Sequence, residues 1–116
     1  AATGRQPVNK NFSQTISIRC EDPAPIIALL EQWDIDQASC DIMGYMGIRL
    51  LADREDPGAY LVIADFGVVD PDVSAADEAA RNNERPETQA TSAAMMANCV
   101  GEPVFRNYDE LYRTDF

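Results

Sequence analysis

IMGYMGIRLL (residues 42–51) and AYLVIADF (residues 59–66) are two largely apolar runs, and the polar stretch ADREDPG (residues 52–58) joins them. Apolar runs of this length around a Pro-Gly turn indicate two antiparallel strands that form a hairpin. Each run contains one charged residue, Arg49 or Asp65. A charge inside an apolar strand is unfavourable unless it is paired or used for function. Arg49 and Asp65 are therefore the first candidates for a functional site.

The segment before the hairpin predicts one strand and one helix. Residues 12–20 alternate apolar and polar side chains, which is typical of a half-buried strand. Asp22 offers a side-chain oxygen to cap a helix, and Pro23 suits the first helical position. Apolar residues then recur at helical spacing, so we expect this helix to end near Gln37.

The segment after the hairpin predicts a broken helical region and a last strand. Ser74 with Asp77 three residues later forms a plausible capping box. Pro86 lacks the amide proton that a helix interior uses, so it should interrupt the helix. We expect the longer helical piece over about 84–99 and a last strand over 104–108. The face of that helix predicted to point inward carries mostly small side chains, which would let the helix backbone lie close to a sheet. Its residues are Ala90, Ala93, Ala94, Met96, Ala97 and Val100.

The order strand, helix, strand, strand, helix, strand predicts an α+β fold of the ferredoxin-like βαββαβ type. In it, helices cover one face of a four-stranded antiparallel sheet. The 116 residues suffice for one domain, which we assign to residues 12–116 with a C-terminal tail from residue 109. Residues 1–11 lack the apolar middle of a secretory signal and indicate a flexible N-terminal arm.

The composition disfavours several classes of partner. The formal net charge of -11 would repel nucleic acids and anionic membrane surfaces, and no apolar run is long enough to span a bilayer. The three cysteines, Cys20, Cys40 and Cys99, are widely spaced, and the chain has no histidine. Neither a disulfide framework nor a metal site is therefore expected. Reduced, mostly buried thiols in a cytoplasmic protein are the simplest interpretation, and a reactive thiol is the alternative.

With this topology the chain resembles the dimeric α+β barrel superfamily, and in particular the antibiotic biosynthesis monooxygenase-like proteins. Three stretches carry the resemblance: the strand at 60–66, the long helix through 85–96, and the segment Gly101-Glu-Pro-Val-Phe105. The resemblance covers about residues 12–108. It implies a homodimer, or dimeric α+β barrel, whose two sheets pack face to face. It also implies a pocket for a small hydrophobic ligand in each protomer, between sheet and helices or at the open ends of the barrel.

Period-two alternation assigns the strand residues to two faces of such a sheet. The face expected under the helices holds Ile16, Ile18, Ile42, Met46, Ile48, Leu50, Tyr60, Val62, Ala64 and Phe66. The opposite face holds Ser17, Arg19, Met43, Tyr45, Arg49, Leu51, Leu61, Ile63 and Asp65. This second face is too apolar to be exposed over its full area, so a second copy should cover it. Gly44 and Gly47 are compatible with a bulge in the strand.

Four residues of the second face are the candidate ligand-binding residues: Arg19, Tyr45, Arg49 and Asp65. Under a structural interpretation, Arg49 pairs with Asp65, and Arg19 reaches Asp65 or a partner carbonyl. Under a functional interpretation, the two arginines orient an anionic or enolate-like oxygen, with Tyr45 as a hydrogen-bond donor.

The resemblance also implies cofactor-free oxidation of aromatic molecules, in a pocket that deprotonates a phenolic substrate and stabilises the carbanion. The chain departs from related haem-handling proteins because it has no histidine, so we expect no cofactor. Trp33 is interpreted as a core anchor rather than a catalytic group, and Asn82 and Asn83 as helix caps rather than pocket-rim amides. Two functions stay open: a cofactor-independent monooxygenase, and a non-catalytic ligand-binding or accessory module.

Overall fold

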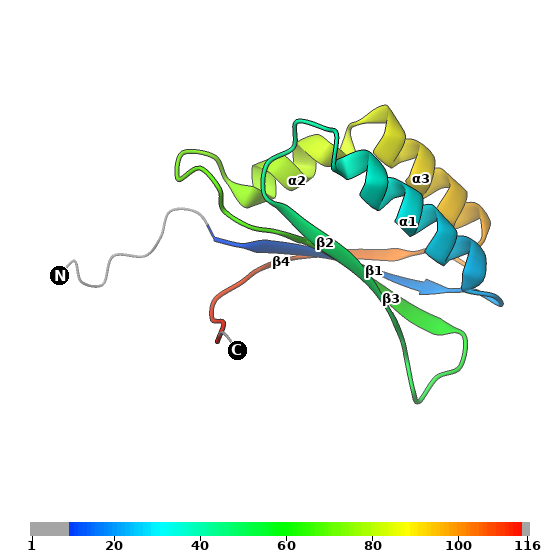
Figure 1. Ribbon diagram of the computed structural model, residues 1–116. Helices are drawn as coiled ribbons and strands as arrows, with labels where there is room; N and C mark the ends of the chain where they lie inside the picture. Colours follow the sequence, from blue (N-terminus) through cyan, green and yellow to red (C-terminus); the bar gives the residue numbers. More distant parts are fainter. Residues whose placement is uncertain (1–9, 115–116) are drawn as a thin grey trace.

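The computed structural model describes residues 10–114, which form one four-stranded sheet with helices on one side of it (Figure 1). The strands lie in the order β2-β3-β1-β4, and every neighbouring pair is antiparallel. The ferredoxin-like βαββαβ prediction is confirmed, including the break before Pro86. The elements are β1 (Phe12–Arg19), α1 (Ala24–Gln37), β2 (Tyr45–Ala52), β3 (Ala59–Phe66), α2 (Ala75–Asn83), α3 (Pro86–Ala97) and β4 (Val104–Asp109).

The helix starts follow the local sequence. The backbone amide of Ala24 donates to Oδ1 of Asp22 at 3.0 Å, which satisfies one of the free donors of the first turn of α1. At the start of α2, the amide of Asp77 donates to Oγ of Ser74 at 3.2 Å. Within residues 10–114, no helix is long and apolar enough to cross a membrane.

The hydrophobic core consists of two clusters that lie between the sheet and the helices. One lies beneath α2 and contains Phe12, Ile42, Ala64, Phe66, Ala75 and Ala79. The other lies beneath α1 and the end of α3 and contains Ile18, Cys20, Ile26, Leu30, Val62 and Met95. The division leaves room between sheet and helices that neither cluster fills.

Helix α3 does not lie on the sheet in the way its sequence predicts. Its one buried residue is Met95, which is 2% exposed, whereas most of the predicted alanine stripe faces water. The helix packs mainly against α1. The prediction of a close approach to the sheet is wrong because this wall of the molecule borders a cavity instead.

The start of β2 contains a β-bulge that changes the face on which Tyr45 lies. Tyr45 pairs with Phe66, and the next paired residue is Gly47, so Met46 is the extra residue. The ring of Tyr45 contacts Trp33 and Phe66 on the helix side, while Met46 is 54% exposed. The face assignment of Tyr45 from simple alternation is therefore wrong, because the inserted residue shifts the alternation at the start of the strand.

The bulge is held by a close approach of two glycine backbones. The amide of Gly67 donates to the carbonyl of Gly44 at 2.6 Å. Gly44 has a φ of +83°, and a Cβ added to it would lie 2.1 Å from the carbonyl oxygen of Gly67. Only glycine fits at position 44 without moving the backbone.

Both ends of the described chain meet at one corner of the sheet. Of the predicted N-terminal arm, residues 1–9 lie outside the described residues. The side chain of Asn11 donates to Oε2 of Glu110 at 2.8 Å, and the amide of Glu110 donates to the carbonyl of Asn11 at 2.8 Å. Beyond this contact, Leu111 and Tyr112 are each 82% exposed, so these tail side chains do not dock on their own sheet.

A carboxylate ties the loop before β2 to helix α2. Glu78 is 7% exposed; it accepts from the amide of Met43 at 2.9 Å and from Nε of Arg81 at 3.0 Å. Arg81 also donates to the carbonyl of Asp41 at 2.9 Å. The hydrogen bond from Arg81 is the main reason that the pKa of Glu78 is lowered.

The first prediction tests the glycine contact. Gly44→Ala should destabilise the protein by more than about 2 kcal/mol, because the left-handed conformation and the backbone clash both oppose a side chain. Gly101→Ala is the matched control, because Gly101 has a φ of +76° but open space around it. Urea unfolding measures both variants. Equal losses of stability would show that the close approach to Gly67 is unimportant.

The second prediction concerns pH. A lowered folded pKa means that ionised Glu78 stabilises the native state above its unfolded pKa of about 4.3, and that this stability is lost as the pH falls through the folded value. Glu78→Gln should cost about 1 kcal/mol at neutral pH and flatten the loss of stability below pH 4.3. Glu31→Gln, which removes an exposed helix carboxylate, serves as the control. If Glu78→Gln loses stability below about pH 4.3 as steeply as the unchanged protein, Glu78 is not the carboxylate responsible.

Candidate functional site

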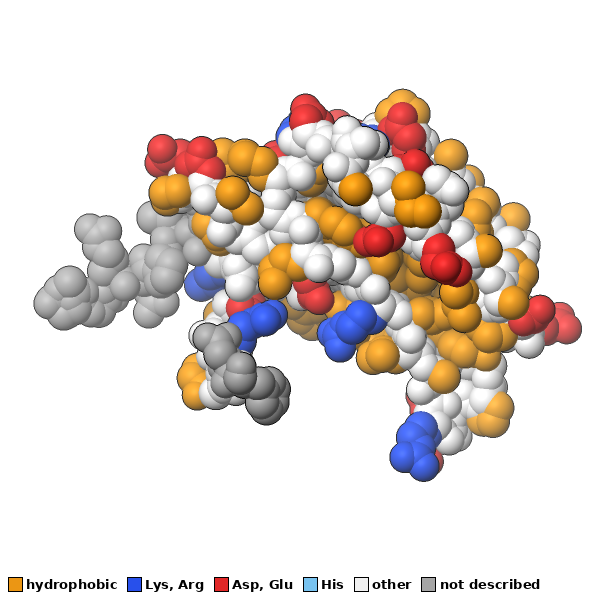
Figure 2. Space-filling model, in the orientation of Figure 1, with side chains coloured by type: hydrophobic (Ala, Val, Ile, Leu, Met, Phe, Trp, Pro, Cys, Tyr) orange, Lys and Arg blue, Asp and Glu red, His pale blue; other side chains and the backbone are white. Residues whose placement is uncertain are grey.

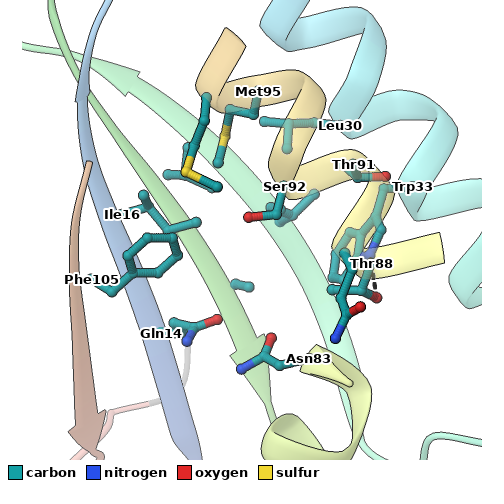
Figure 3. A pocket seen from close by; sticks show the side chains of 15 residues that line it. Gln14, Ile16, Leu30, Trp33, Asn83, Thr88, Thr91, Ser92, Met95 and Phe105 are labelled. Carbon is teal, nitrogen blue, oxygen red and sulfur yellow. Dashed lines mark hydrogen bonds between the residues drawn. The ribbon is translucent and has the colours of Figure 1, made fainter. Parts of the chain in front are cut away.

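A cavity of about 480 Å³ lies between the sheet and the helices α1 and α3 (Figure 3). Its walls come from every strand and every helix of the fold, so its shape depends on the whole domain. The lining residues are Gln14, Ile16, Leu30, Trp33, Ile48, Val62, Ala64, Asn83, Thr88, Gln89, Thr91, Ser92, Met95, Met96 and Phe105. Mostly apolar walls with a few polar groups are typical of small-molecule sites.

The cavity wall carries no ionisable side chain. Its polar groups are the amides of Gln14, Asn83 and Gln89 and the hydroxyls of Thr88, Thr91 and Ser92. Such groups donate and accept hydrogen bonds but do not titrate near neutral pH. Within residues 10–114, no three His, Cys, Asp or Glu side chains come together as a metal site would need.

A hydrogen-bond network joins the three helices behind the cavity wall. Nε1 of Trp33 donates to Oγ1 of Thr88 at 3.0 Å, and Oγ1 of Thr88 lies 3.4 Å from Oδ1 of Asn82. The same Oδ1 accepts from Nε2 of Gln37 at 3.2 Å and from Nη1 of Arg85 at 3.1 Å. The network holds the indole ring of Trp33 through one hydrogen bond, that to Thr88, whose hydroxyl is in turn placed by Asn82.

Asn82 is the centre of this network and is 1% exposed. Its Nδ2 is the one buried side-chain polar atom in the described part of the chain without a hydrogen-bond partner. An unsatisfied buried donor is destabilising. The three hydrogen bonds that the side-chain oxygen of Asn82 accepts offset this cost. The interpretation of Asn82 and Asn83 as caps is wrong, because Arg85 is the N-cap of α3, and Asn83 lies on the cavity wall.

Trp33 is a core residue that also borders the cavity. It is 6% exposed and packs in the interior, which agrees with its interpretation as an anchor. One side of it lines the cavity, and its ring lies edge-to-face against Tyr45 with the centroids 5.2 Å apart. An aromatic wall of this kind suits a flat, apolar ligand.

Tyr45 backs the cavity wall rather than the outer face of the sheet. Its hydroxyl donates to Oδ1 of Asp34 at 2.5 Å. Burial and then the neighbouring Asp34 carboxylate raise the pKa of Tyr45 well above its ordinary value. The phenol therefore stays protonated and acts as a support for Trp33.

The other three candidate residues lie on the outer face of the sheet but do not form one group. Arg19 pairs with Asp56 at 2.8 Å, and this hydrogen bond raises the pKa of Arg19. Asp65 accepts from Oγ of Ser13 at 2.6 Å. Arg49 is exposed and has no ion pair with any residue between 10 and 114. The expected pairing of Arg49 or Arg19 with Asp65 is not formed within the protomer.

The outer face carries a third arginine, Arg106, in addition to Arg19 and Arg49, which the sequence already placed there. The strand register places Arg49, Ile63, Thr15 and Arg106 in one row across the sheet. In Figure 2, most of the visible Lys and Arg side chains lie along the side away from the helices, while Asp and Glu gather over helices and loops. The strongly acidic chain thus has an outer sheet face of the opposite sign.

Few of the cavity residues can be recognised as site residues from the sequence. Gln14 is the exception, because it interrupts the apolar side of β1 between Phe12 and Ile16. A polar residue at an inward strand position could have indicated a site. Thr88 and Ser92 look like ordinary surface residues of a helix until the fold brings them to the cavity.

The third prediction tests the indole hydrogen bond. Thr88→Val keeps the shape of the side chain but removes the acceptor of Trp33, so we expect a loss of about 1 to 2 kcal/mol and a changed Trp33 emission. Thr91→Val is the matched control, because Thr91 lies on the same helix wall and makes no side-chain hydrogen bond within residues 10–114. If both variants behave alike in unfolding and fluorescence, the network does not hold the indole ring.

Comparison with known proteins identifies the fold. No family model and no curated protein matches the sequence. Among solved structures, the chain is similar to a mutant form of SnoaB, a cofactor-independent oxygenase from Streptomyces nogalater. The TM-score is 0.68 at 14% identity, over 90% of this chain and 96% of that one.

Two further solved structures have the same architecture. A proposed antibiotic biosynthesis monooxygenase from Caulobacter crescentus has a TM-score of 0.61 at 19% identity, over 90% of this chain and 92% of that one. A conserved protein from Methanosarcina mazei has a TM-score of 0.66 at 8% identity, over 88% and 94%. The chain therefore has the ferredoxin-like fold that SnoaB and antibiotic biosynthesis monooxygenase-like proteins share.

Proposed function

We propose that the protein is a cofactor-independent monooxygenase that oxidises a small hydrophobic, aromatic molecule. The observation that carries the proposal is the cavity of about 480 Å³ between sheet and helices, in a fold shared with a cofactor-independent oxygenase. Its volume lies within the range of roughly 300–1,000 Å³ that is usual for small-molecule sites. The ring of Trp33 and the side chains of Met95 and Phe105 suit a flat apolar ligand.

The reaction requires a substrate with an acidic C–H next to an aromatic ring. Loss of that proton gives a carbanion, and addition of O₂ forms a C–O bond and, after protonation, a hydroperoxide. Loss of water then leaves a carbonyl, so that CH₂ and O₂ become C=O and H₂O. Because no ionisable side chain lines the cavity, the proton leaves to water, and amides such as that of Asn83 stabilise the developing enolate oxygen.

The proposal includes a homodimer that buries the outer face of the sheet. Exposed Leu51 and Val104 flank Leu61 and Ser17 in one row of this face, and the neighbouring row ends in Arg49 and Arg106. Burying an apolar face of this kind in an interface is favourable. The arginines at its edge then need carboxylates in the same interface. A second copy supplies them through residues such as its own Asp65. The three free cysteines suit a reducing compartment such as the cytoplasm.

One observation favours a second candidate, a non-catalytic ligand-binding module. The cavity wall lacks a general base, which most enzymes that abstract a proton place within hydrogen-bond reach of the substrate. In that case the protein binds the same class of molecule and passes it on unchanged.

The fourth prediction distinguishes the two candidates. With anthrone, a tricyclic ketone with an acidic CH₂ group, the protein should consume O₂ and release anthraquinone, with one ¹⁸O atom incorporated from ¹⁸O₂. The rate should be insensitive to EDTA, and it should rise with pH through the pKa of the substrate. Ligand-induced thermal stabilisation without O₂ uptake above that of free anthrone would support the binding module instead.

The fifth prediction concerns Arg49. Arg49→Ala should raise the dissociation constant of the dimer by at least about tenfold in sedimentation experiments, because the partner carboxylate loses its counter-charge. Arg54→Ala, an exposed arginine of the β2–β3 turn, is the control and should leave the dimer unchanged. If Arg49→Ala stays dimeric but loses turnover, Arg49 belongs to the reaction site rather than to the interface.

A further inference from the structure

Trp33 and Tyr45 connect the cavity wall with the surface of the protein. Trp33 lines the cavity, and its ring lies edge-to-face against that of Tyr45, with the centroids 5.2 Å apart and the ring planes at 87°. The hydroxyl of Tyr45 donates to Oδ1 of Asp34 at 2.5 Å, and Asp34 is exposed on α1. An indole, a phenol and a carboxylate thus lead, one after the other, from the cavity to water.

The two aromatic side chains have hydrogen-bond partners of different basicity. Nε1 of Trp33 donates to the hydroxyl of Thr88 at 3.0 Å (Figure 3). A hydroxyl group is too weak a base to take up a proton, so an indole that loses an electron here stays a radical cation. The phenol of Tyr45 instead donates to a carboxylate, which is acceptor-only and can take up a proton. The loss of one electron is therefore completed at Tyr45, where the proton that must leave with it has an acceptor.

The path ends at Tyr45. On the other side of this ring lies that of Phe66, which is 2% exposed, with the centroids 5.8 Å apart. A phenyl ring has no exchangeable proton and is much harder to oxidise than indole or phenol, so the path does not continue into the core. Among residues 10–114, no other tyrosine ring contacts Trp33.

We infer that Trp33, Tyr45 and Asp34 form a relay that carries one oxidising equivalent from the cavity to the protein surface. The oxidant is a peroxyl radical, which forms when a substrate radical in the cavity combines with O₂. The inference goes beyond the proposed function and rests on it only for this source of the radical. Its consequence is that a stray radical does not oxidise the cavity wall permanently.

Electrons and protons balance over the relay. The peroxyl radical takes one electron from Trp33 and one proton from water, and becomes a hydroperoxide. Tyr45 returns one electron to the indole radical cation and transfers its hydroxyl proton to Asp34, which leaves a neutral phenoxyl radical. Asp34 releases the proton to solvent, where it neutralises the hydroxide formed first. A hydrogen atom has then moved from Tyr45 to the peroxyl radical, and a thiol in solution restores the phenol by giving up one hydrogen atom.

Photoionisation of Trp33 tests the relay without substrate or turnover. Trp33 is the one tryptophan of the chain, so light that indole absorbs and phenol does not creates the radical at one known position. In the unchanged protein, under anaerobic conditions, transient absorption should show the indole radical decaying as a phenoxyl radical forms. Tyr45→Phe should lose the phenoxyl signal and prolong the indole radical. A phenoxyl signal of unchanged size in folded Tyr45→Phe would overturn the inference.

Two further variants test the proton acceptor. Asp34→Asn keeps a hydrogen-bond acceptor beside Tyr45 but removes the base, so the yield of the phenoxyl radical should fall although both rings remain. Tyr60→Phe is the matched control, because Tyr60 on β3 has no ring contact within residues 10–114, and it should keep the full phenoxyl signal. Melting temperatures show whether each variant folds. If Asp34→Asn forms as much phenoxyl radical as the unchanged protein, the relay does not end at Asp34 and the inference is wrong.

The outcome can be separated from that of the proposed function. A phenoxyl signal that depends on Tyr45 and Asp34, with no O₂ consumption in the anthrone assay, would support the relay and overturn the monooxygenase proposal. Turnover of anthrone combined with a phenoxyl signal that Tyr45→Phe leaves unchanged would do the reverse.

Discussion

The hydrogen bond between the amide of Gly67 and the carbonyl of Gly44 is the contact on which the arrangement of the two sheet faces depends. It brings two backbones close together where β3 ends and β2 begins, and one extra residue follows in β2. Because side chains alternate along a strand, that residue decides which groups face the helices. Tyr45 consequently supports Trp33 behind the cavity, and Arg49 lies on the outer face.

Much of the fold could be predicted from local patterns. Alternation in β1, the capping signals of α1 and α2 and the break before Pro86 all act within a few residues, so the sequence displays them directly. The face of Tyr45 could not be predicted, although Gly44 and Gly47 indicate a bulge. Two glycines show that the strand can bend, but the packing of Trp33 and Phe66 decides which residue is inserted.

The candidate site was harder to predict than the fold. Charged residues within apolar strands are conspicuous, which is why Arg19, Arg49 and Asp65 stand out in the sequence. The structure gives each of them separate surroundings on the outer face. The cavity depends instead on neutral residues such as Gln14, Asn83 and Thr88, which are common on any surface. They become a site only because the tertiary fold brings β1, α2 and α3 to one space.

Helix α3 has a consequence for the amount of folded protein in a cell. Met95 is the one fully buried residue of that helix, and the cavity separates the rest of the helix from the sheet. A molecule bound there would extend the hydrophobic core, because it adds apolar contacts that only the native state can make. At a concentration about 100 times its Kd, it would add roughly 2.7 kcal/mol to the free energy of unfolding. The supply of the ligand would then govern how long the chain survives proteolysis, so abundance and activity would rise together.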